Sequence, residues 1–548
     1  MIRRCDDLPD GTVLNADVCV IGGGPAGLTV AAELAGTSLR VILIEAGGEP
    51  GRPLGLTESS VADRQGDLAP PLQIPPRLGG GANEWIVRLP KMQRGVRMLP
   101  LAPFDLETRS WVPNSGWPIT WSELDRYYQR ANEFLGLSSL GYTLEEWEDT
   151  QHPRLPLEAH GFTTTMEHFA SPSVFTKSIR QTLADCANVD VYLDGAVGAI
   201  DGAADQATHV MVDHGTAGRV QVKANQFVLA AGGINNARLL LSARDHAGFA
   251  GSQVATGRYY VDHQRIGVGS LTPSDPGIFR TAGLYDLTTR ASTSVMGKLT
   301  PTEALLTTHR ILHSGSMLLP KPPAKIEQGL TDVRSLVSRS RQPGTPRPSI
   351  ASLAQTALYI AKTGTQMAAR QRRLPPRIDA GWSGLTKTSF GRFSVETQIE
   401  LAPDRNNRVH LGNARDQFGR RRPEMFWRWH ELDLHTVKTN TALLATAFQK
   451  SQLGRFEPEA WDARPLLTTP NGAFHPSGTT RMGDNASTSV TDCNAKLHSA
   501  SNVYVAGSSL FPTVGYANPT LTIVALAIRL ADHLRPSAIA VAATPVSG

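Results

Sequence analysis

The sequence predicts an α/β protein of more than one domain, and three features of the 548-residue chain support this. A β-α-β pattern fills residues 16–48, β-rich segments occupy the middle of the chain, and a strand-turn-helix pattern follows at 502–533. A chain of this length is too long for one hydrophobic core, which indicates two or three domains. Hydrophobic residues make up 41% and charged residues 19%, so neither a disordered nor a membrane-embedded protein is favoured.

The first pattern is typical of a dinucleotide-binding unit. A short apolar strand at 18–21 leads into a glycine turn, a helix opens at 28–34, and a second apolar strand follows at 41–44. In such a unit the first glycine permits a tight turn, the second lets the backbone approach a pyrophosphate, and the third lets the helix pack closely. The helix N-terminus offers free N–H groups and a positive dipole end to the phosphates. The three glycine positions are Gly22, Gly24 and Gly27.

Glu45 ends the second strand of this unit. It stands at about the 20-residue offset at which a carboxylate bonds a ribose hydroxyl. No arginine follows Glu45 directly, so a 2′-phosphate is not favoured. The unit therefore predicts a nucleotide site without deciding between NAD and FAD, the alternative being that its glycines only make a tight turn.

Charge and cysteine content narrow the classes of protein to which this chain can belong. The net charge of +5 is small and concentrates in a basic stretch at 321–377, which we interpret as a solvated insert or lid in preference to a membrane-surface or partner-binding helix. The four cysteines lie far apart, which predicts neither disulfides nor a metal site. Arg3 and Arg4 precede acidic residues where an export signal needs an apolar segment, so we expect a cytoplasmic protein.

Several later segments predict further elements. LGGGANEW at 78–85 brings glycine backbone and Trp85 close to a flat ligand, unless it is only a hinge before a strand. Thr120 is expected to cap a helix that carries Glu123 in its first turn. Alternating residues at 393–411 predict a hairpin whose turn lies at 402–407.

Five sequence blocks in order resemble the glucose-methanol-choline (GMC) flavoprotein oxidoreductases, and most closely their sugar-oxidising, pyranose oxidase-like branch. The blocks are VIGGGPAG with Glu45, LGGGANEW, VLAAGGINNARLLL, HPSGTTRMG, and VAGSSLFPTVGYANPTLTIVALAIRLADHL. The resemblance implies FAD bound to a discontinuous Rossmann-like domain at 1–110, 170–265 and 466–548. It also implies a substrate domain at 111–169 and 266–465, built on an antiparallel β-sheet flanked by helices, with the basic insert at about 321–377.

The resemblance also implies the site residues. His475 falls on the family's catalytic histidine, and Asn518 on the second position, which holds histidine or asparagine. An alcohol gives up hydride only as its hydroxyl loses a proton, which imidazole is suited to accept. The cofactor residues implied are Gly22, Gly24, Gly27, Glu45, Gly80, Gly81, Asn83, Trp85, Val197, Gly232, Gly507, Ser508, Pro519 and Thr520, with no metal.

Two departures from the family refine this expectation. Members with covalently attached flavin carry a histidine before the residue that matches Trp85, and here that residue is Glu84, so FAD is expected to be non-covalent. Pyranose 2-oxidases carry a threonine where this chain has Ile86, which favours neither 2-oxidation nor ready use of oxygen.

The expected function is FAD-dependent oxidation of a CH–OH group of a sugar, glycoside, aminoglycoside or polyol to a carbonyl. The electrons pass to oxygen or another acceptor, and neither a nucleic-acid partner nor an integral membrane segment is expected. The alternatives are a redox-neutral lyase that keeps FAD as structure, FAD-dependent oxidation of a non-sugar alcohol, or a binding protein with a silent site. The presence of both His475 and Asn518 argues against the last of these.

Overall fold

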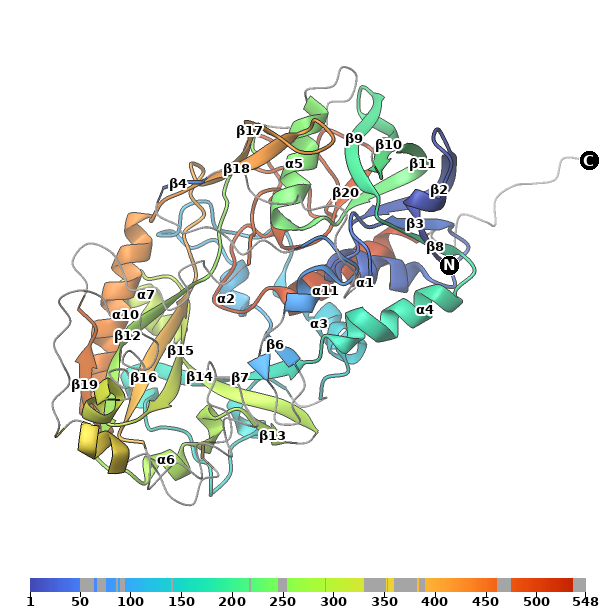
Figure 1. The fold of residues 1–548 in the computed structure, drawn as a ribbon. Coiled ribbons are helices and arrows are strands. Elements are labelled where there is room, and N and C mark those ends of the chain that lie inside the picture. Colours follow the sequence, from blue (N-terminus) through green and yellow to red (C-terminus); the bar gives the residue numbers. More distant parts are fainter. Residues whose placement is uncertain are drawn as a thin grey trace, which may run out of the picture.

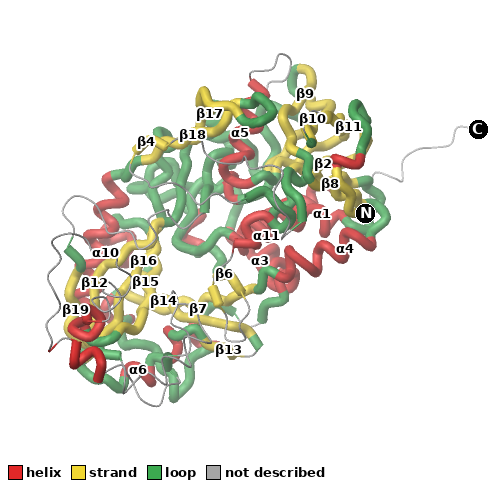
Figure 2. Tube along the Cα trace, viewed as in Figure 1, coloured by secondary structure: helices red, strands yellow, loops and turns green. Residues whose placement is uncertain are grey.

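The computed structural model describes residues 1–49, 64–66, 75–84, 87–88, 94–138, 141–215, 218–244, 254–290, 292–329, 351, 353–358, 382–383, 390–460 and 475–535. In Figure 1 these residues form two large sheets, sheet A at the upper right and sheet B at the lower left. A small sheet C lies along the upper edge. Helices α1, α3, α4 and α11 gather on one side of sheet A, below its parallel strands in the view of Figure 2. The helices are α1 (Pro25–Leu34), α2 (Pro103–Leu106), α3 (Trp121–Leu135), α4 (Ile179–Asp185), α5 (Gly232–Arg244), α6 (Ile278–Thr281), α7 (Glu303–His309), α10 (Glu431–Lys450) and α11 (Thr520–Leu534).

Sheet A joins strands from both ends and the middle of the chain. Its order is β1-β8-β3-β2-β11-β10-β9, and β20 pairs with the end of β11. The pairs from β1 to β11, and the pair of β11 with β20, are parallel, whereas β9, β10 and β11 form an antiparallel meander. The strands are β1 (Ile2–Arg4), β2 (Val13–Ile21), β3 (Val41–Ile44), β8 (Val189–Leu193), β9 (Ala196–Ala203), β10 (Gln206–His214), β11 (Gly218–Leu229) and β20 (Val503–Val505).

The predicted β-α-β unit is confirmed, and strands from both ends of the chain lie in one sheet. β2 and β3 pair in parallel with α1 between them, and the four residues of β3 are all buried. In register, Ile21 lies opposite both Ile44 and Leu229, and Leu229 lies opposite Val505. The carboxyl ends of four strands therefore lie at one level.

Sheet B is antiparallel throughout its described pairs, as expected for the second domain. Its order is β19-β12-β16-β15-β14-β7-β6-β5, with β13 paired to β14. The long helix α10 packs against β19 and β12. The strands are β5 (Val87–Arg88), β6 (Arg94–Met98), β7 (Phe162–Ala170), β12 (Gln264–Pro273), β13 (Thr288–Arg290), β14 (Thr293–Pro301), β15 (Ser314–Lys321), β16 (Arg392–Ile399) and β19 (Gly454–Pro458).

The predicted hairpin at 393–411 is wrong. β16 pairs with β12 and β15 in sheet B, whereas the next strand, β17 (Arg408–Arg415), pairs with β18 (Arg421–Trp427) in sheet C. β4 (Arg64–Gly66) completes sheet C. The chain leaves sheet B at Glu400, whose fully buried carboxylate accepts hydrogen bonds from Arg109 Nη1 at 2.8 Å and Nη2 at 2.6 Å. Alternation predicts a strand with two different faces, but not which strand it pairs with.

The cap of α3 is confirmed, because Thr120 Oγ1 accepts a hydrogen bond from Glu123 N at 3.3 Å. α3 packs against α11, and Arg529 of α11 bonds Glu123 at 2.7 Å. Sheet B contains β5 and β6, which come from the range 1–110 that was predicted for the FAD domain. Helix α3 comes from the predicted substrate range 111–169, but it packs against α11 of the FAD range. The division of the chain into two domains, with its boundaries, stays a prediction.

Some expectations fall outside the described residues. These are Trp85, Ile86 and most of the basic stretch, including 330–350 and 359–381. Within the residues that are described, no helix is long and apolar enough to cross a membrane.

Replacing Gly27 by alanine is expected to destabilise sheet A. A Cβ at Gly27 would lie 1.9 Å from Gly22 O, so α1 has to move away from the end of β2. Overpacking of this kind costs about 1–3 kcal/mol in the free energy of unfolding. The melting temperature measured without FAD should therefore fall in Gly27→Ala. It should stay unchanged in the control Gly24→Ala, whose Cβ would meet no atom closer than 4.0 Å, and equal melting temperatures in the two variants would contradict this account.

Candidate active site

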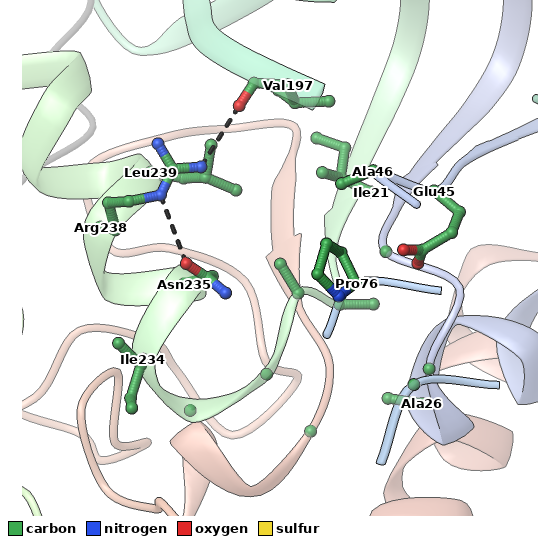
Figure 3. A pocket seen from close by; sticks show the side chains of 18 of the residues that line it. Ile21, Ala26, Glu45, Ala46, Pro76, Val197, Ile234, Asn235, Arg238 and Leu239 are labelled. Atoms are coloured by element: carbon green, nitrogen blue, oxygen red, sulfur yellow. Dashed lines mark hydrogen bonds between the residues drawn. The ribbon is translucent and has the colours of Figure 1, made fainter. Parts of the chain in front are cut away.

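A cavity of about 320 Å³ opens at the carboxyl ends of the parallel strands of sheet A. The residues that follow β2, β3, β11 and β20 all line it, in the form of Gly22, Glu45, Ala230 and Ala506. In open α/β sheets, ligands bind at this edge because the loops from neighbouring strands converge there. Figure 3 shows Glu45 on one side of the cavity, with Val197 and Arg238 across from it.

The structure brings together most of the residues that were predicted to hold the cofactor. Nine of them line the cavity: Gly22, Gly24, Glu45, Gly80, Gly81, Val197, Gly232, Gly507 and Ser508. Gly27 lies beneath the turn, and Asn83 closes the glycine loop by donating to Leu78 O at 2.9 Å and Gly80 O at 3.0 Å. Pro519 and Thr520 begin α11 and are not among the lining residues, and Trp85 is outside the described residues.

Glu45 holds the backbone around the cavity in place. Its Oε2 accepts from Gly23 N at 2.7 Å and its Oε1 accepts from Gly47 N at 2.9 Å. Burial raises the pKa of Glu45 above its ordinary value, while the two N–H donors act in the opposite direction. The carboxylate was predicted to bind a ribose hydroxyl. That contact stays a prediction, and the observed role is to brace the glycine turn.

Arg238 of α5 is a cavity residue that the sequence reasoning missed. Its Nη2 donates to Val197 O at 3.3 Å and its Nε donates to Asn235 Oδ1 at 3.4 Å (Figure 3). Its buried Nη1 has no hydrogen-bond partner among the described residues, and burial lowers the pKa of Arg238 to about 10. A buried cation, glycine backbone at Gly22 and Gly24, and the N-terminus of α1 together suit an anionic dinucleotide such as FAD.

The two predicted catalytic residues meet beside this cavity. His475 Nε2 lies 3.3 Å from Asn518 Nδ2, and His475 directly precedes Pro476, which lines the cavity. His475 is half-buried as a residue, whereas Asn518 is buried. Their catalytic roles are predictions, but the structure does bring the two side chains into contact.

The surroundings of His475 keep its ring neutral. Its pKa lies well below the ordinary histidine value of 6.5, chiefly because of burial and then because of His263, Arg265, Lys298 and Arg97. Lys298 Nζ forms an ion pair with Glu167 Oε1 at 2.7 Å, and Arg97 Nε forms one with Glu167 Oε2 at 2.8 Å. One carboxylate is thus shared by two cations, which disfavours a further positive charge nearby.

Asp262 and His263 are site residues that no motif in the sequence revealed. Asp262 Oδ1 accepts from the backbone N–H of His263 at 2.7 Å and from that of His475 at 2.9 Å. His263 Nδ1 lies 3.0 Å from His475 Nδ1. Atoms of these three side chains lie within 4.8 Å of one another, and the hydrogen bonds account for their arrangement without an ion. The expected absence of a metal stays a prediction.

Comparison with known proteins identifies the class. A family model described as FAD dependent oxidoreductase matches residues 17–344, which is more than half of the chain, and one described as GMC oxidoreductase matches residues 403–527. The chain therefore belongs to the FAD-dependent oxidoreductases, and its C-terminal segment is similar to the GMC oxidoreductases. FAD is accordingly its cofactor.

The curated relatives match over limited segments. Paromamine 6′-oxidase of Streptomyces fradiae is 33% identical over 138 residues, which are 25% of this chain and 24% of that protein. Pyranose 2-oxidase of Tricholoma matsutake is 38% identical over 151 residues, which are 26% of this chain and 25% of that protein. The alignments span about a quarter of each relative, so they do not extend to the whole enzyme.

A solved structure of formate oxidase covers 96% of this chain and 99% of its own chain, with a TM-score of 0.52 and 15% identity. Identity at this level shows that the two chains share a fold. It gives no information about the substrate.

Replacing Glu45 by glutamine is expected to weaken FAD binding. The amide offers one acceptor where two N–H groups need one each, so a buried N–H at Gly23 or Gly47 loses its partner. Such a loss costs about 1–3 kcal/mol and distorts the turn, which corresponds to a dissociation constant for FAD raised about 5- to 150-fold. Flavin fluorescence titration of the apoprotein measures this. Glu49→Gln is the matched control, since Glu49 pairs with Arg180 outside the cavity, and equal affinities in the two variants would remove Glu45 from the cofactor site.

Proposed function

We propose that this chain oxidises a CH–OH group of a sugar, glycoside, aminoglycoside or polyol to a carbonyl. The observation that carries the proposal is the pairing of His475 Nε2 with Asn518 Nδ2 at 3.3 Å, next to the cavity of an FAD-dependent oxidoreductase. When bound, FAD supplies the acceptor for the hydride that leaves the carbinol carbon. Non-covalent binding is part of the proposal, because Glu84 stands where a linking histidine is needed and forms an ion pair with Arg77.

His475 and Asn518 divide the work at the hydroxyl oxygen. The neutral imidazole accepts the hydroxyl proton at Nε2, which raises the electron density that expels the hydride. Asn518 Nδ2 donates a hydrogen bond to the same oxygen and holds it in line, but an amide cannot take the proton. General base catalysis of this kind contributes typically about 10²–10⁴-fold in rate.

A further observation supports a polyhydroxylated substrate. Curated relatives carry the names paromamine 6′-oxidase, C-glycoside 3-oxidase and pyranose 2-oxidase, which are oxidases of sugars or glycosides.

Replacing His475 by glutamine is expected to slow flavin reduction by at least about 100-fold while leaving FAD content normal, because His475 is not among the residues that line the cofactor cavity. The flavin absorbance of the holoenzyme is followed without oxygen as sugars, glycosides, aminoglycosides and polyols are added. His435→Gln, at an exposed position on α10, is the matched control and should behave as wild type. A wild-type protein that no member of the panel bleaches would contradict the redox proposal and favour the lyase. Equal rates in His475→Gln and wild type would exclude His475 as the base.

The pH dependence of flavin reduction follows from the lowered pKa of His475. The neutral ring is the active form, and a lowered pKa moves its protonation to lower pH. The rate at low substrate concentration is therefore expected to stay constant as the pH falls through 6.5, the ordinary value, and to decline only well below it. Stopped-flow reduction across this range measures it. A decline that already begins above pH 6.5 would contradict burial of the base among Arg97, Arg265, Lys298 and His263.

A further inference from the structure

We propose that His263 is a positioning residue that fixes His475 in the tautomer with hydrogen on Nδ1 and a free electron pair on Nε2. The kinetic part of this inference rests on the proposed function, whereas the tautomer itself does not. The argument starts from two backbone carbonyls, because a carbonyl oxygen only accepts hydrogen bonds.

The first carbonyl is that of Gly515. His263 Nε2 lies 3.0 Å from Gly515 O, so this nitrogen carries a hydrogen and donates it. Burial lowers the pKa of His263 to about 4, and the ring is therefore neutral. A neutral ring with hydrogen on Nε2 has its electron pair on Nδ1.

That electron pair determines the state of His475. The Nδ1 atoms of His263 and His475 lie 3.0 Å apart, and the two rings meet edge to face at 79°. Because His263 Nδ1 can only accept, His475 Nδ1 has to donate. The other nitrogen of His475, Nε2, is then unprotonated, as a base must be.

The second carbonyl, that of Tyr516, leads to the same result from the opposite end. Gln398 Nε2 donates to Tyr516 O at 2.6 Å and to Asn518 Oδ1 at 3.1 Å. With its oxygen engaged in this way, Asn518 turns its Nδ2 toward His475 Nε2. A donating amide needs an acceptor, so His475 Nε2 again carries the electron pair.

The backbone makes this chain of hydrogen bonds rigid. Gly515 and Tyr516 are adjacent in the chain. Asp262 Oδ1 accepts from the backbone N–H of His263 and from that of His475, which lies 213 positions after Asp262. If His263 could not accept, His475 Nδ1–H would be buried without a partner. The ring would then favour the other tautomer, whose Nε2–H cannot take a proton from a substrate.

The matched variants His263→Leu and His263→Asn test this role. They have similar shape, but only asparagine places an oxygen near the position of His263 Nδ1, where it can accept from His475. We expect His263→Leu to reduce the limiting rate of flavin reduction at least about tenfold with KM changed less than about threefold, and His263→Asn to recover most of the rate. Both variants should retain FAD, since His263 does not line the cofactor cavity. Equal rates in the two variants would overturn the proposal.

A spectroscopic measurement separates this inference from the proposed function. In holoenzyme labelled with ¹⁵N-histidine, solid-state NMR distinguishes protonated from unprotonated ring nitrogens, and the spectrum of His475→Gln assigns the signals of His475. We expect hydrogen on Nδ1 of His475 in the wild type and a mixture of tautomers in His263→Leu. Hydrogen on Nε2 in the wild type, or the same tautomer in His263→Leu, would overturn the inference. No substrate is needed, so the result holds even where no compound bleaches the flavin.

Discussion

The whole site depends on the parallel pairing of β11 with β2 along one edge and with β20 along the other. These three strands come from the start, the middle and the end of the chain, and only their register brings Ile21, Leu229 and Val505 to one level. Since each strand ends there, the loops that begin at Gly22, Ala230 and Ala506 meet around one cavity. Closing contacts between such distant segments costs chain entropy. The burial of apolar strands such as β3 on both faces offsets this cost.

Side chains of sheet B also hold the site in place. The segment that carries Asn518 follows β20, but its conformation is held from the other side by side chains of sheet B. Gln398 of β16 binds the carbonyl of Tyr516, and Thr165 of β7 bonds the Tyr516 hydroxyl at 2.5 Å. Just before β12, His263 binds the carbonyl of Gly515. The cofactor cavity and the pair of His475 and Asn518 are therefore connected by buried hydrogen bonds across the two sheets, and such bonds are strongly directional.

Local patterns in the sequence were sufficient to predict individual helices and strands, and the five sequence blocks were sufficient to predict most residues that line the cavity. The glycine turn, the cap at Thr120 and the position of His475 next to Asn518 follow from residues close to one another in the sequence or from a family resemblance. The partner of β16 does not, because alternation is the same whichever strand lies beside it. Asp262, His263 and Gln398 were missed for a related reason: each acts on residues more than one hundred positions away, and none belongs to a motif. Only the fold brings them to the site.

The choice of carbonyls at both ends of the His475 network has a chemical consequence. A carboxylate in hydrogen-bond contact with the ring would orient a histidine equally well, but its charge would raise the pKa and favour the protonated form. The carbonyl of Gly515 orients the His263 ring and that of Tyr516 orients the Gln398 amide, and neither carbonyl is charged or titrates. Burial, together with His263, Arg265, Lys298 and Arg97, lowers the pKa of His475 and so favours its neutral form. Orientation and basicity of His475 are thus set by different groups, and in the proposed mechanism the imidazolium would be a high-energy species that readily gives its proton up again.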